Sequence, residues 1–107
     1  LQEAEKTEEN RVMGCVSRVW MVGGLDDSTS PPRMTFRADS DAHIVRGLIA
    51  VVMILFDGEP PATIAERDAL AFFARVGLDQ HLTQSRSNGL HSMVGRIKDL
   101  AAREVSA

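Results

Sequence analysis

The chain has little cysteine, no excess of positive charge and no long hydrophobic run. Its 107 residues include one cysteine, which excludes an internal disulfide and a four-cysteine zinc site. Twelve Lys and Arg residues stand against fifteen Asp and Glu residues, which gives a net charge of −3, so nucleic acid is not an expected partner. The longest apolar run, Leu48 to Phe56, is much shorter than the roughly 20 residues that span a bilayer, so no membrane partner is expected.

The start of the chain has no recognisable targeting signal. Leu1 to Arg11 is mostly charged and polar and lacks the apolar core of a signal peptide. The single cysteine gives no sign of an oxidising compartment either, so we expect a cytoplasmic protein. The length suits one domain, residues 1–107, and a composition of 44% hydrophobic and 25% charged residues is typical of a globular protein with one core.

The first half of the chain predicts a small antiparallel sheet. Val16 to Val22 is rich in β-branched and aromatic residues, which favours a strand that Gly23-Gly24 ends. Leu25 to Pro32 is built from turn residues and predicts an exposed loop. Met34 to Ala38 alternates apolar and polar residues, which predicts a second strand, and Asn10 to Met13 can add a short third one.

The second half predicts helices. Ala42 to Phe56 has apolar residues at helical spacing, Asp39-Ser40-Asp41 offers side chains for the N-cap, and the last two turns are apolar on all sides, which indicates a central buried helix. Shorter helical segments are predicted at Thr63 to Arg67 and at Leu70 to Val76. Strands followed by helices indicate an α+β fold, with a small antiparallel sheet packed against a helical second half. The last helix, with its cap at Ser85 or Ser87, has an apolar stripe of Leu90, Met93, Val94, Ile97, Leu100 and Ala101.

Cys15 is the first candidate for chemistry. It follows Gly14, which lets the backbone bend, and it precedes the first predicted strand, so we expect it on a loop or at a strand edge. A thiolate can attack carbon, sulfur or a metal, and its reactivity depends on its pKa and exposure. The alternative is a small buried hydrophobic residue, which is common for free cysteines. Composition and spacing leave both interpretations open.

The histidines and one polar stretch are weaker candidates. His43, His81 and His91 show no spacing typical of a metal site, and no metal site is predicted. A thiol hydrolase built from Cys15 and His81 remains an alternative, whereas His43 and His91 are interpreted as polar positions on helix surfaces. The stretch Ser85 to Gly89 is either a loop with a helix cap or a means of placing its arginine near a thiolate or a partner's carboxylate.

Four segments together resemble the SufE family of sulfur-acceptor proteins, which includes the CsdE proteins. Each segment is weak alone, but they occur in the family's order and span nearly the whole chain. They are Glu8-Glu9-Asn10-Arg11-Val12, Gly14-Cys15-x-Ser17-x-Val19-Trp20, Asp39-Ser40-Asp41-Ala42-x-Ile44-Val45-x-Gly47-Leu48-Ile49-Ala50, and His81-Leu82-Thr83-x-Ser85-Arg86-Ser87-Asn88-Gly89-Leu90.

The resemblance implies a fold similar to that of the iron–sulfur scaffold protein IscU, and it implies a function. SufE-like proteins take the sulfane sulfur from the persulfide of a pyridoxal-phosphate-dependent cysteine desulfurase of the SufS or CsdA type, and they stimulate that enzyme. They pass the sulfur to the SufBCD scaffold for iron–sulfur cluster assembly. The acceptor cysteine of the family matches Cys15. The chain is then a sulfur carrier and desulfurase activator, not a free-standing enzyme, and it needs no cofactor or metal of its own.

The family's motifs also place Gly14, Ser17, Asp41 and Arg86 near the cysteine loop, with a role in loop position or partner contact. The chain departs from the family at Val16, where glutamine is common, and at Gln84, which replaces a proline, and the family's N-terminal helix is missing. Three alternatives stay open. An IscU-like scaffold would need three cysteines or equivalent ligands, the small cysteine-dependent hydrolase would turn over substrate alone, and a plain binding module would have an inert cysteine.

Overall fold

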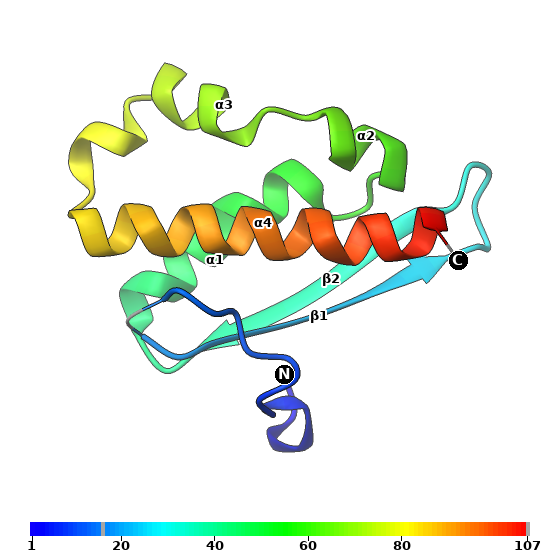
Figure 1. The fold of residues 1–107 in the computed structure, drawn as a ribbon, viewed down its shortest axis with the longest axis horizontal. Helices are drawn as coiled ribbons and strands as arrows, with labels where there is room; N and C mark the ends of the chain where they lie inside the picture. The colour runs from blue at the N-terminus through cyan, green and yellow to red at the C-terminus, as the bar shows by residue number, and fades with distance from the viewer. Residues whose placement is uncertain (16, 107) are drawn as a thin grey trace.

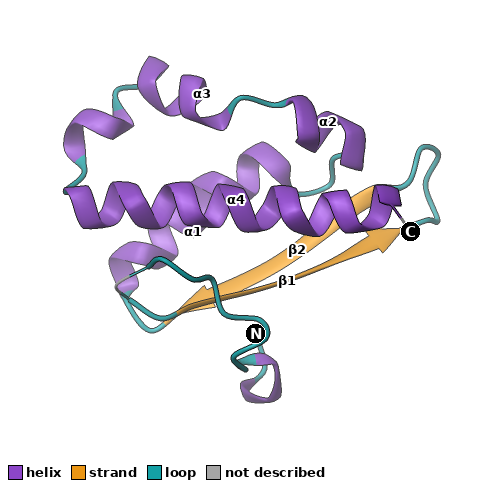
Figure 2. Cartoon of the chain, in the orientation of Figure 1, coloured by secondary structure: helices purple, strands orange, loops and turns teal. Residues whose placement is uncertain are grey.

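The chain folds as an antiparallel hairpin followed by helices, in a computed structural model that describes residues 1–15 and 17–106. Strand β1 (Val19–Asp26) pairs with β2 (Arg33–Ser40), with Val19 opposite Ser40 and Asp26 opposite Arg33. Figure 2 shows the two strands on one side of the molecule and the helices packed over them. The predicted α+β class is therefore confirmed.

Both strands end later than predicted, whereas β1 begins only at Val19, so the prediction of a strand at Ser17 and Arg18 is wrong. Val16, the predicted start of the first strand, lies outside the described residues. β1 continues through Gly23 and Gly24, because Gly23 pairs with Phe36 and leaves the room that this ring occupies. A Cβ added to Gly23 would lie 2.9 Å from the Phe36 ring. β2 includes Asp39 and Ser40, which were expected at a helix start. Within β2, Met34 is buried and its neighbour Thr35 is exposed, as the alternation predicts.

A short N-terminal segment lies along the outer edge of β1. The segment begins with a single turn, η1 (Glu3–Glu5), and then runs antiparallel to β1. The amide of Met21 donates to the carbonyl of Asn10 at 2.8 Å, and the amide of Val12 donates to the carbonyl of Val19 at 2.8 Å. The predicted strand at Asn10 to Met13 is therefore reduced to an isolated bridge of this segment with β1.

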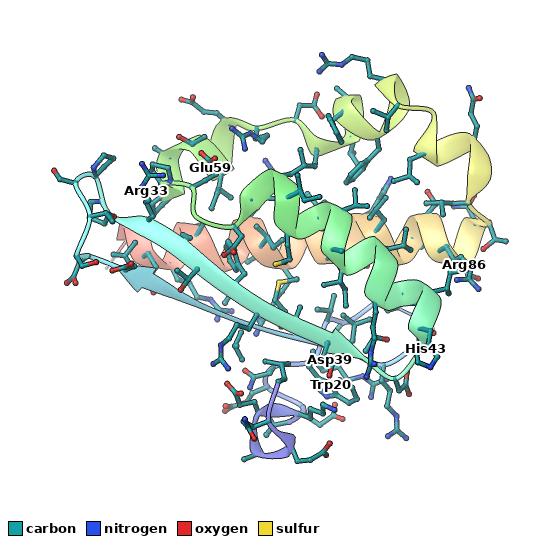
Figure 3. The ribbon with its side chains drawn as sticks, turned by 180° about the vertical axis from the view of Figure 1, so that it is seen from behind. Trp20, Arg33, Asp39, His43, Glu59 and Arg86 are labelled. Atoms are coloured by element: carbon teal, nitrogen blue, oxygen red, sulfur yellow. The ribbon has the colours of Figure 1, made fainter. Side chains whose placement is uncertain are left out.

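Helix α1 (His43–Phe56) ends where it was expected to end, but it is not buried on all sides. The amide of Asp57 closes its last turn on the carbonyl of Met53. Ile44 and Ile54 are 58% and 81% exposed, so the prediction of a helix buried on every side is wrong. The reason is that β2 and the last helix cover only one side of α1, and Figure 3 shows the other side open to the viewer. The buried side of α1 consists of Leu48, Ile49, Val52 and Phe56.

Three further helices complete the chain: α2 (Pro61–Glu66), α3 (Ala69–Arg75) and α4 (Gln84–Ser106), with a turn η2 (Leu78–His81) before α4. The two short predicted helices exist, and the structure begins α2 two residues and α3 one residue earlier than predicted. The carboxylate of Asp68 accepts from the amide of Ala71 at 3.0 Å and so caps α3. The cap expected at Ser85 or Ser87 is instead Thr83, whose hydroxyl accepts from the amide of Arg86 at 3.3 Å.

Helix α4 crosses the whole molecule in Figure 1, with α2 and α3 on one side and the hairpin on the other. Its apolar stripe is buried as predicted, and each such side chain contributes about 1.5–3 kcal/mol relative to an exposed one. Helix α4 contacts β1, α1 and α2 and so joins the hairpin to the other helices. The core is made of Val12, Val19, Met21, Met34, Phe36, Leu48, Ile49, Val52, Phe56, Ile64, Ala69, Phe73, Leu90, Met93, Val94, Ile97, Leu100 and Ala101.

Candidate functional site

Cys15 lies on a loop that joins the N-terminal segment to β1. We call residues 13–15 and 17–18 the Cys15 loop. The antiparallel bond from the amide of Val12 to the carbonyl of Val19 closes the base of this loop at 2.8 Å. The sequence predicted a loop or strand edge for Cys15, and the structure places it on the loop. A loop closed at its base holds its tip at a defined place on the protein.

The end of the Cys15 loop is fastened by the residues that precede α1. The backbone amide of Arg18 donates to the carboxylate of Asp41 at 3.2 Å. The carbonyl of Arg18 accepts from the hydroxyl of Ser40 at 2.6 Å, and that buried hydroxyl also accepts from the amide of Ala42 at 3.2 Å. The expected N-cap side chains therefore hold the Cys15 loop, and Ala42 begins α1 without a side-chain cap.

The tip of the Cys15 loop packs closely against α4, and two glycines permit this approach. Gly14 has a φ of +89°, which L side chains rarely adopt, and a Cβ there would lie 2.5 Å from the hydroxyl of Ser92. A Cβ on Gly89 would lie 3.5 Å from Sγ of Cys15. The thiol of Cys15 donates to the carbonyl of Gly89 at 3.7 Å. The sulfur thus rests against the backbone of α4.

Sγ of Cys15 faces a pocket of about 210 Å³ between the loop, α1 and the first turns of α4. Its lining combines apolar residues with hydroxyl-bearing residues and Arg86. Figure 3 shows Arg86 at the end of the molecule where α1 begins with His43. Nη1 of Arg86 is buried and has no hydrogen-bond partner among the described residues. The lining residues are Cys15, Ser17, Val45, Leu48, Thr83, Ser85, Arg86, Gly89 and Met93.

The surroundings of Cys15 favour the neutral thiol. Burial raises the pKa of Cys15, and the positive charge of Arg11 opposes this effect only in part. A hydrogen bond from the thiol to a carbonyl also favours the protonated form. A self-activated nucleophile has a depressed pKa or a base in contact, and the described contacts of Cys15 provide neither. In this conformation the thiol is therefore partly buried and kept in its protonated, less reactive form; we call such a thiol guarded.

The structure brings most of the predicted site residues together. Gly14 and Ser17 lie on the Cys15 loop, and Arg86 lines the same pocket as Cys15. Asp41 does not line the pocket but binds the backbone of the loop at Arg18. The stretch expected to be a loop around Arg86 is instead the first turns of α4, so its guanidinium is carried by a helix.

Sequence reasoning missed several residues of the site. Val45, Leu48 and Met93 form the apolar wall of the pocket, and their helical spacing marked them only as core. The positive charge of Arg11 acts to lower the pKa of Cys15. The sequence analysis assigned Arg11 no such role. Gly89 could have been found, because a glycine inside a predicted helix indicates close packing.

The histidines lie outside this arrangement or outside the described side chains. His43 and His91 are exposed on α1 and α4, as interpreted from the sequence. His81 lies in η2, and its side chain is outside the described part of the structure, so the alternative of a hydrolase built from Cys15 and His81 stays a prediction. Among the side chains that the structure describes, no three of His, Cys, Asp or Glu gather as metal ligands, and no described helix is long and apolar enough to cross a membrane.

The fold and this pocket define a small α+β protein that holds one thiol in the same pocket as an arginine with a buried nitrogen. The chain belongs to the SufE family: the family described as "SufE: Fe-S metabolism associated domain" matches residues 1–101. It is 47% identical to a SufE-like protein of Rhizobium etli over 107 residues, which is all of this chain and 72% of the relative. It is 44% identical to a SufE-like protein of Rhizobium meliloti, again over the whole chain and 76% of the relative.

Membership in this family identifies the coarse function. The chain is an accessory protein of iron–sulfur metabolism with a role in sulfur transfer, and the family implies partnership with a cysteine desulfurase. The resemblance seen in the four sequence segments is therefore confirmed.

Proposed function

We propose that Cys15 accepts sulfane sulfur from the persulfide of a pyridoxal-phosphate-dependent cysteine desulfurase of the SufS or CsdA type. In the same proposal the chain stimulates the desulfurase by removing its sulfur and then delivers that sulfur to a SufBCD-type scaffold in the cytoplasm. Residues 1–107 act as one SufE-like domain. The observation that carries the proposal is the place of the chain's one cysteine, on a fastened loop with its sulfur in a pocket.

The transfer itself is a thiol–disulfide exchange. The thiolate of Cys15 attacks the outer sulfur of the donor's persulfide, a new S–S bond forms on Cys15, and the S–S bond of the donor breaks. The donor's cysteine leaves as a thiolate. Cys15 loses one proton when it ionises, and the departing thiolate of the donor takes up one proton, so the protons balance. No oxidant is required, so a protein with one thiol is sufficient.

The pocket supports the second requirement of a carrier, which is to protect the sulfur between donor and acceptor. The apolar wall of Val45, Leu48 and Met93 limits water around Sγ of Cys15. Because burial also keeps the pKa of Cys15 raised, the thiol reacts slowly with small electrophiles until a partner draws the loop out. The desulfurase is then stimulated because transfer of the sulfur to Cys15 restores its free active-site cysteine.

Arg86 supports the loaded state. The persulfide that forms on Cys15 is an anion when its outer sulfur is ionised, and Nη1 of Arg86 is a buried donor without a partner in the same pocket. A guanidinium stabilises such an anion through its positive charge and its hydrogen-bond donors. The buried donor gains a hydrogen bond when the sulfur arrives.

Gly14, Ser17 and Asp41 support the position of the loop. Gly14 lets the loop approach Ser92, and Asp41 holds the amide of Arg18. Ser17 lines the pocket beside Cys15 and offers a hydroxyl to the transferred sulfur. These residues set where the sulfur lies when a partner approaches.

The test is intact-mass spectrometry of the protein after incubation with a SufS-type desulfurase and L-cysteine. We expect the wild type to gain one sulfur atom that reductant removes, and we expect Cys15→Ser to gain none. Sulfur on a residue other than Cys15, or no gain with a desulfurase that is itself loaded, would contradict the proposal. A longer chain is assayed beside residues 1–107, and failure of both removes the acceptor role.

The Arg86→Gln variant tests the role of the guanidinium. A hydrogen bond to a charged group contributes about 1.5–3 kcal/mol, so loss of it slows sulfur uptake roughly 10- to 100-fold. Arg75→Gln is the matched control, because Arg75 is exposed on α3 and away from the pocket. Equal rates for the two variants would remove Arg86 from the proposal and leave Cys15 in it.

A further inference from the structure

A second pocket lies at the opposite end of α4, beside the outer edge of β1. It has a volume of about 580 Å³ and is more polar than the Cys15 pocket. Along α4, Arg86 and Arg103 are separated by a rise of about 25 Å, so the two pockets do not overlap. The lining residues are Glu9, Asn10, Val22, Gly23, Arg96, Leu100 and Arg103.

The strand edge in this pocket has unused hydrogen-bonding groups. The amide of Met21 points away from β2, since it donates to the carbonyl of Asn10. Backbone groups repeat their direction every second residue, so those of Gly23 and Leu25 point to the same outer side. No described residue beyond the hairpin bonds to the backbone of either one, and Leu25 is 38% exposed. The N-terminal segment therefore covers only the first half of this edge.

Two arginines of α4 stand beside the uncovered half. Arg96 donates through Nη2 to the carbonyl of Glu9 at 3.1 Å, but its Nε is buried without a partner in the described part of the chain. Arg103 is exposed and forms no ion pair with the described residues. Burial and the charge of Arg103 both lower the pKa of Arg96, whereas the charge of Asp99 opposes this effect. Glu9 also lines the pocket, but within the described part of the chain no ion pair joins either arginine to the carboxylate of Glu9 or of Asp99.

We propose that this edge and these arginines bind an extended, acidic segment of a partner protein. The segment adds a strand beside Gly23 and Leu25 through main-chain hydrogen bonds, as the N-terminal segment does beside Met21. Its acidic side chains reach Arg96 and Arg103. Those two residues are about 10.5 Å apart along α4, and side chains two residues apart on a strand are about 6.7 Å apart. Acidic residues at alternate positions therefore fall within reach of both flexible arginines.

The charges favour a different protein over a second copy of this chain. Pairing of two copies at this edge would bring two Arg96 and two Arg103 side chains to one interface. Like charges juxtaposed at an interface cost several kcal/mol, whereas an acidic strand gains from the same groups. A partner bound here also leaves the Cys15 pocket open, because the pockets lie at different ends of α4.

The test uses the whole chain, labelled with ¹⁵N, and two capped peptides of sequence TEVEVT and TQVQVT. We expect TEVEVT to shift the amide resonances of Gly23 and Leu25 and to slow their hydrogen exchange. TQVQVT should bind at least tenfold more weakly. Absence of shifts with TEVEVT, or equal affinity of the two peptides, would overturn the proposal.

Variants separate the two parts of the proposed interface. The double variant Arg96→Gln/Arg103→Gln should weaken TEVEVT at least tenfold, and Arg75→Gln should leave its affinity unchanged. Leu25→Pro removes one outward amide without removing a bond to β2, so it should prevent strand addition. If Leu25→Pro fails to fold, the arginine variants still decide the outcome. Unchanged affinity in the double variant contradicts the inference.

Two further experiments test whether a different ligand or a second copy of the chain occupies this surface. Glutarate supplies the carboxylates without a backbone, and it should leave the amides of Gly23 and Leu25 unshifted. If glutarate reproduces all the shifts of TEVEVT, the surface is only an anion site and the strand proposal is wrong. Sedimentation of the free protein should show no dimer that Leu25→Pro abolishes, and such a dimer would assign the edge to a second copy instead.

Discussion

The two ends of α4 differ in how each is covered. At the N-terminal end, the Cys15 loop packs onto the helix until Sγ of Cys15 contacts Gly89, and the pocket holds a guarded thiol. At the C-terminal end, the helix lies beside a strand edge that the N-terminal segment leaves half uncovered. Both ends have an arginine with a buried nitrogen that has no hydrogen-bond partner among the described residues, Arg86 at the first and Arg96 at the second.

The different covering of its two ends suits α4 to two kinds of site. A buried donor without a partner is costly, so it is expected to be satisfied in some functional state. At the N-terminal end, the sulfur that we propose Cys15 accepts would supply the missing partner inside the protein's own pocket. At the C-terminal end the missing partner has to come from outside, because the surrounding backbone is open. The first end therefore suits group transfer and the second suits docking.

The largest expected effect is a loss of stability when the packing of the middle of α4, between its two ends, is disrupted. Ile97 is fully buried between them, and Ile97→Ala should destabilise the protein by about 2–5 kcal/mol. Ile54→Ala is the control, because Ile54 is 81% exposed, and it should change stability by no more than about 0.5 kcal/mol. Urea unfolding followed by circular dichroism measures both. Similar losses in the two variants would show that α4 is not the common support of the two ends.

A smaller effect should appear when the N-terminal end alone is loosened. Gly14→Ala forces a side chain into a φ of +89° and toward the hydroxyl of Ser92, at a cost of about 1–3 kcal/mol. We expect a lower melting temperature and faster alkylation of Cys15 in the folded protein, since the loop leaves α4.

The matched control for that variant is Gly24→Ala. Gly24 has no atom within 4 Å of an added Cβ and no positive φ, so this variant should leave the alkylation rate at the wild-type value. Binding of TEVEVT should also survive in Gly14→Ala, because the second pocket lies away from the loop. An alkylation rate that Gly14→Ala leaves unchanged would mean that this contact does not guard the thiol.

The smallest effect concerns pH. Burial raises the pKa of Cys15 in the folded protein, so ionisation of the thiol favours the unfolded chain. The stability from this group is fully present below the ordinary thiol pKa of about 8.5 and is lost as the pH rises above it. We therefore expect the wild type to lose more stability than Cys15→Ser in urea unfolding between about pH 7 and pH 10. An equal loss in both proteins would contradict a raised pKa for this thiol.

Much of the fold followed from periodic patterns in the sequence. The alternation from Met34 to Ala38 and the stripe beginning at Leu90 predicted the faces that are buried, because each pattern reports one element against one core. The bounds of the strands were wrong at Gly23 and Ser40. Cross-strand pairing and the space that Phe36 needs decided those positions, and neither is a local property of the chain.

The candidate site divides in the same way. Four short motifs identified Cys15, Gly14, Ser17, Asp41 and Arg86 through resemblance, and the structure places all of them in or beside one loop. The side chains expected to cap α1 bind Arg18 instead, because a loop arriving from elsewhere in the chain competes for them. Spacing along the chain contains no information about such a competitor.

The sequence by itself determined the class of fold, the one cysteine and the family, since composition, periodicity and motifs are properties of the chain alone. Only the tertiary structure decided that the thiol is guarded, because burial and the carbonyl of Gly89 come from the far end of the chain. It alone also set Arg96 and Arg103 beside an unpaired strand edge. Charge, burial and hydrogen-bond satisfaction depend on neighbours in space, and folding brings those neighbours together.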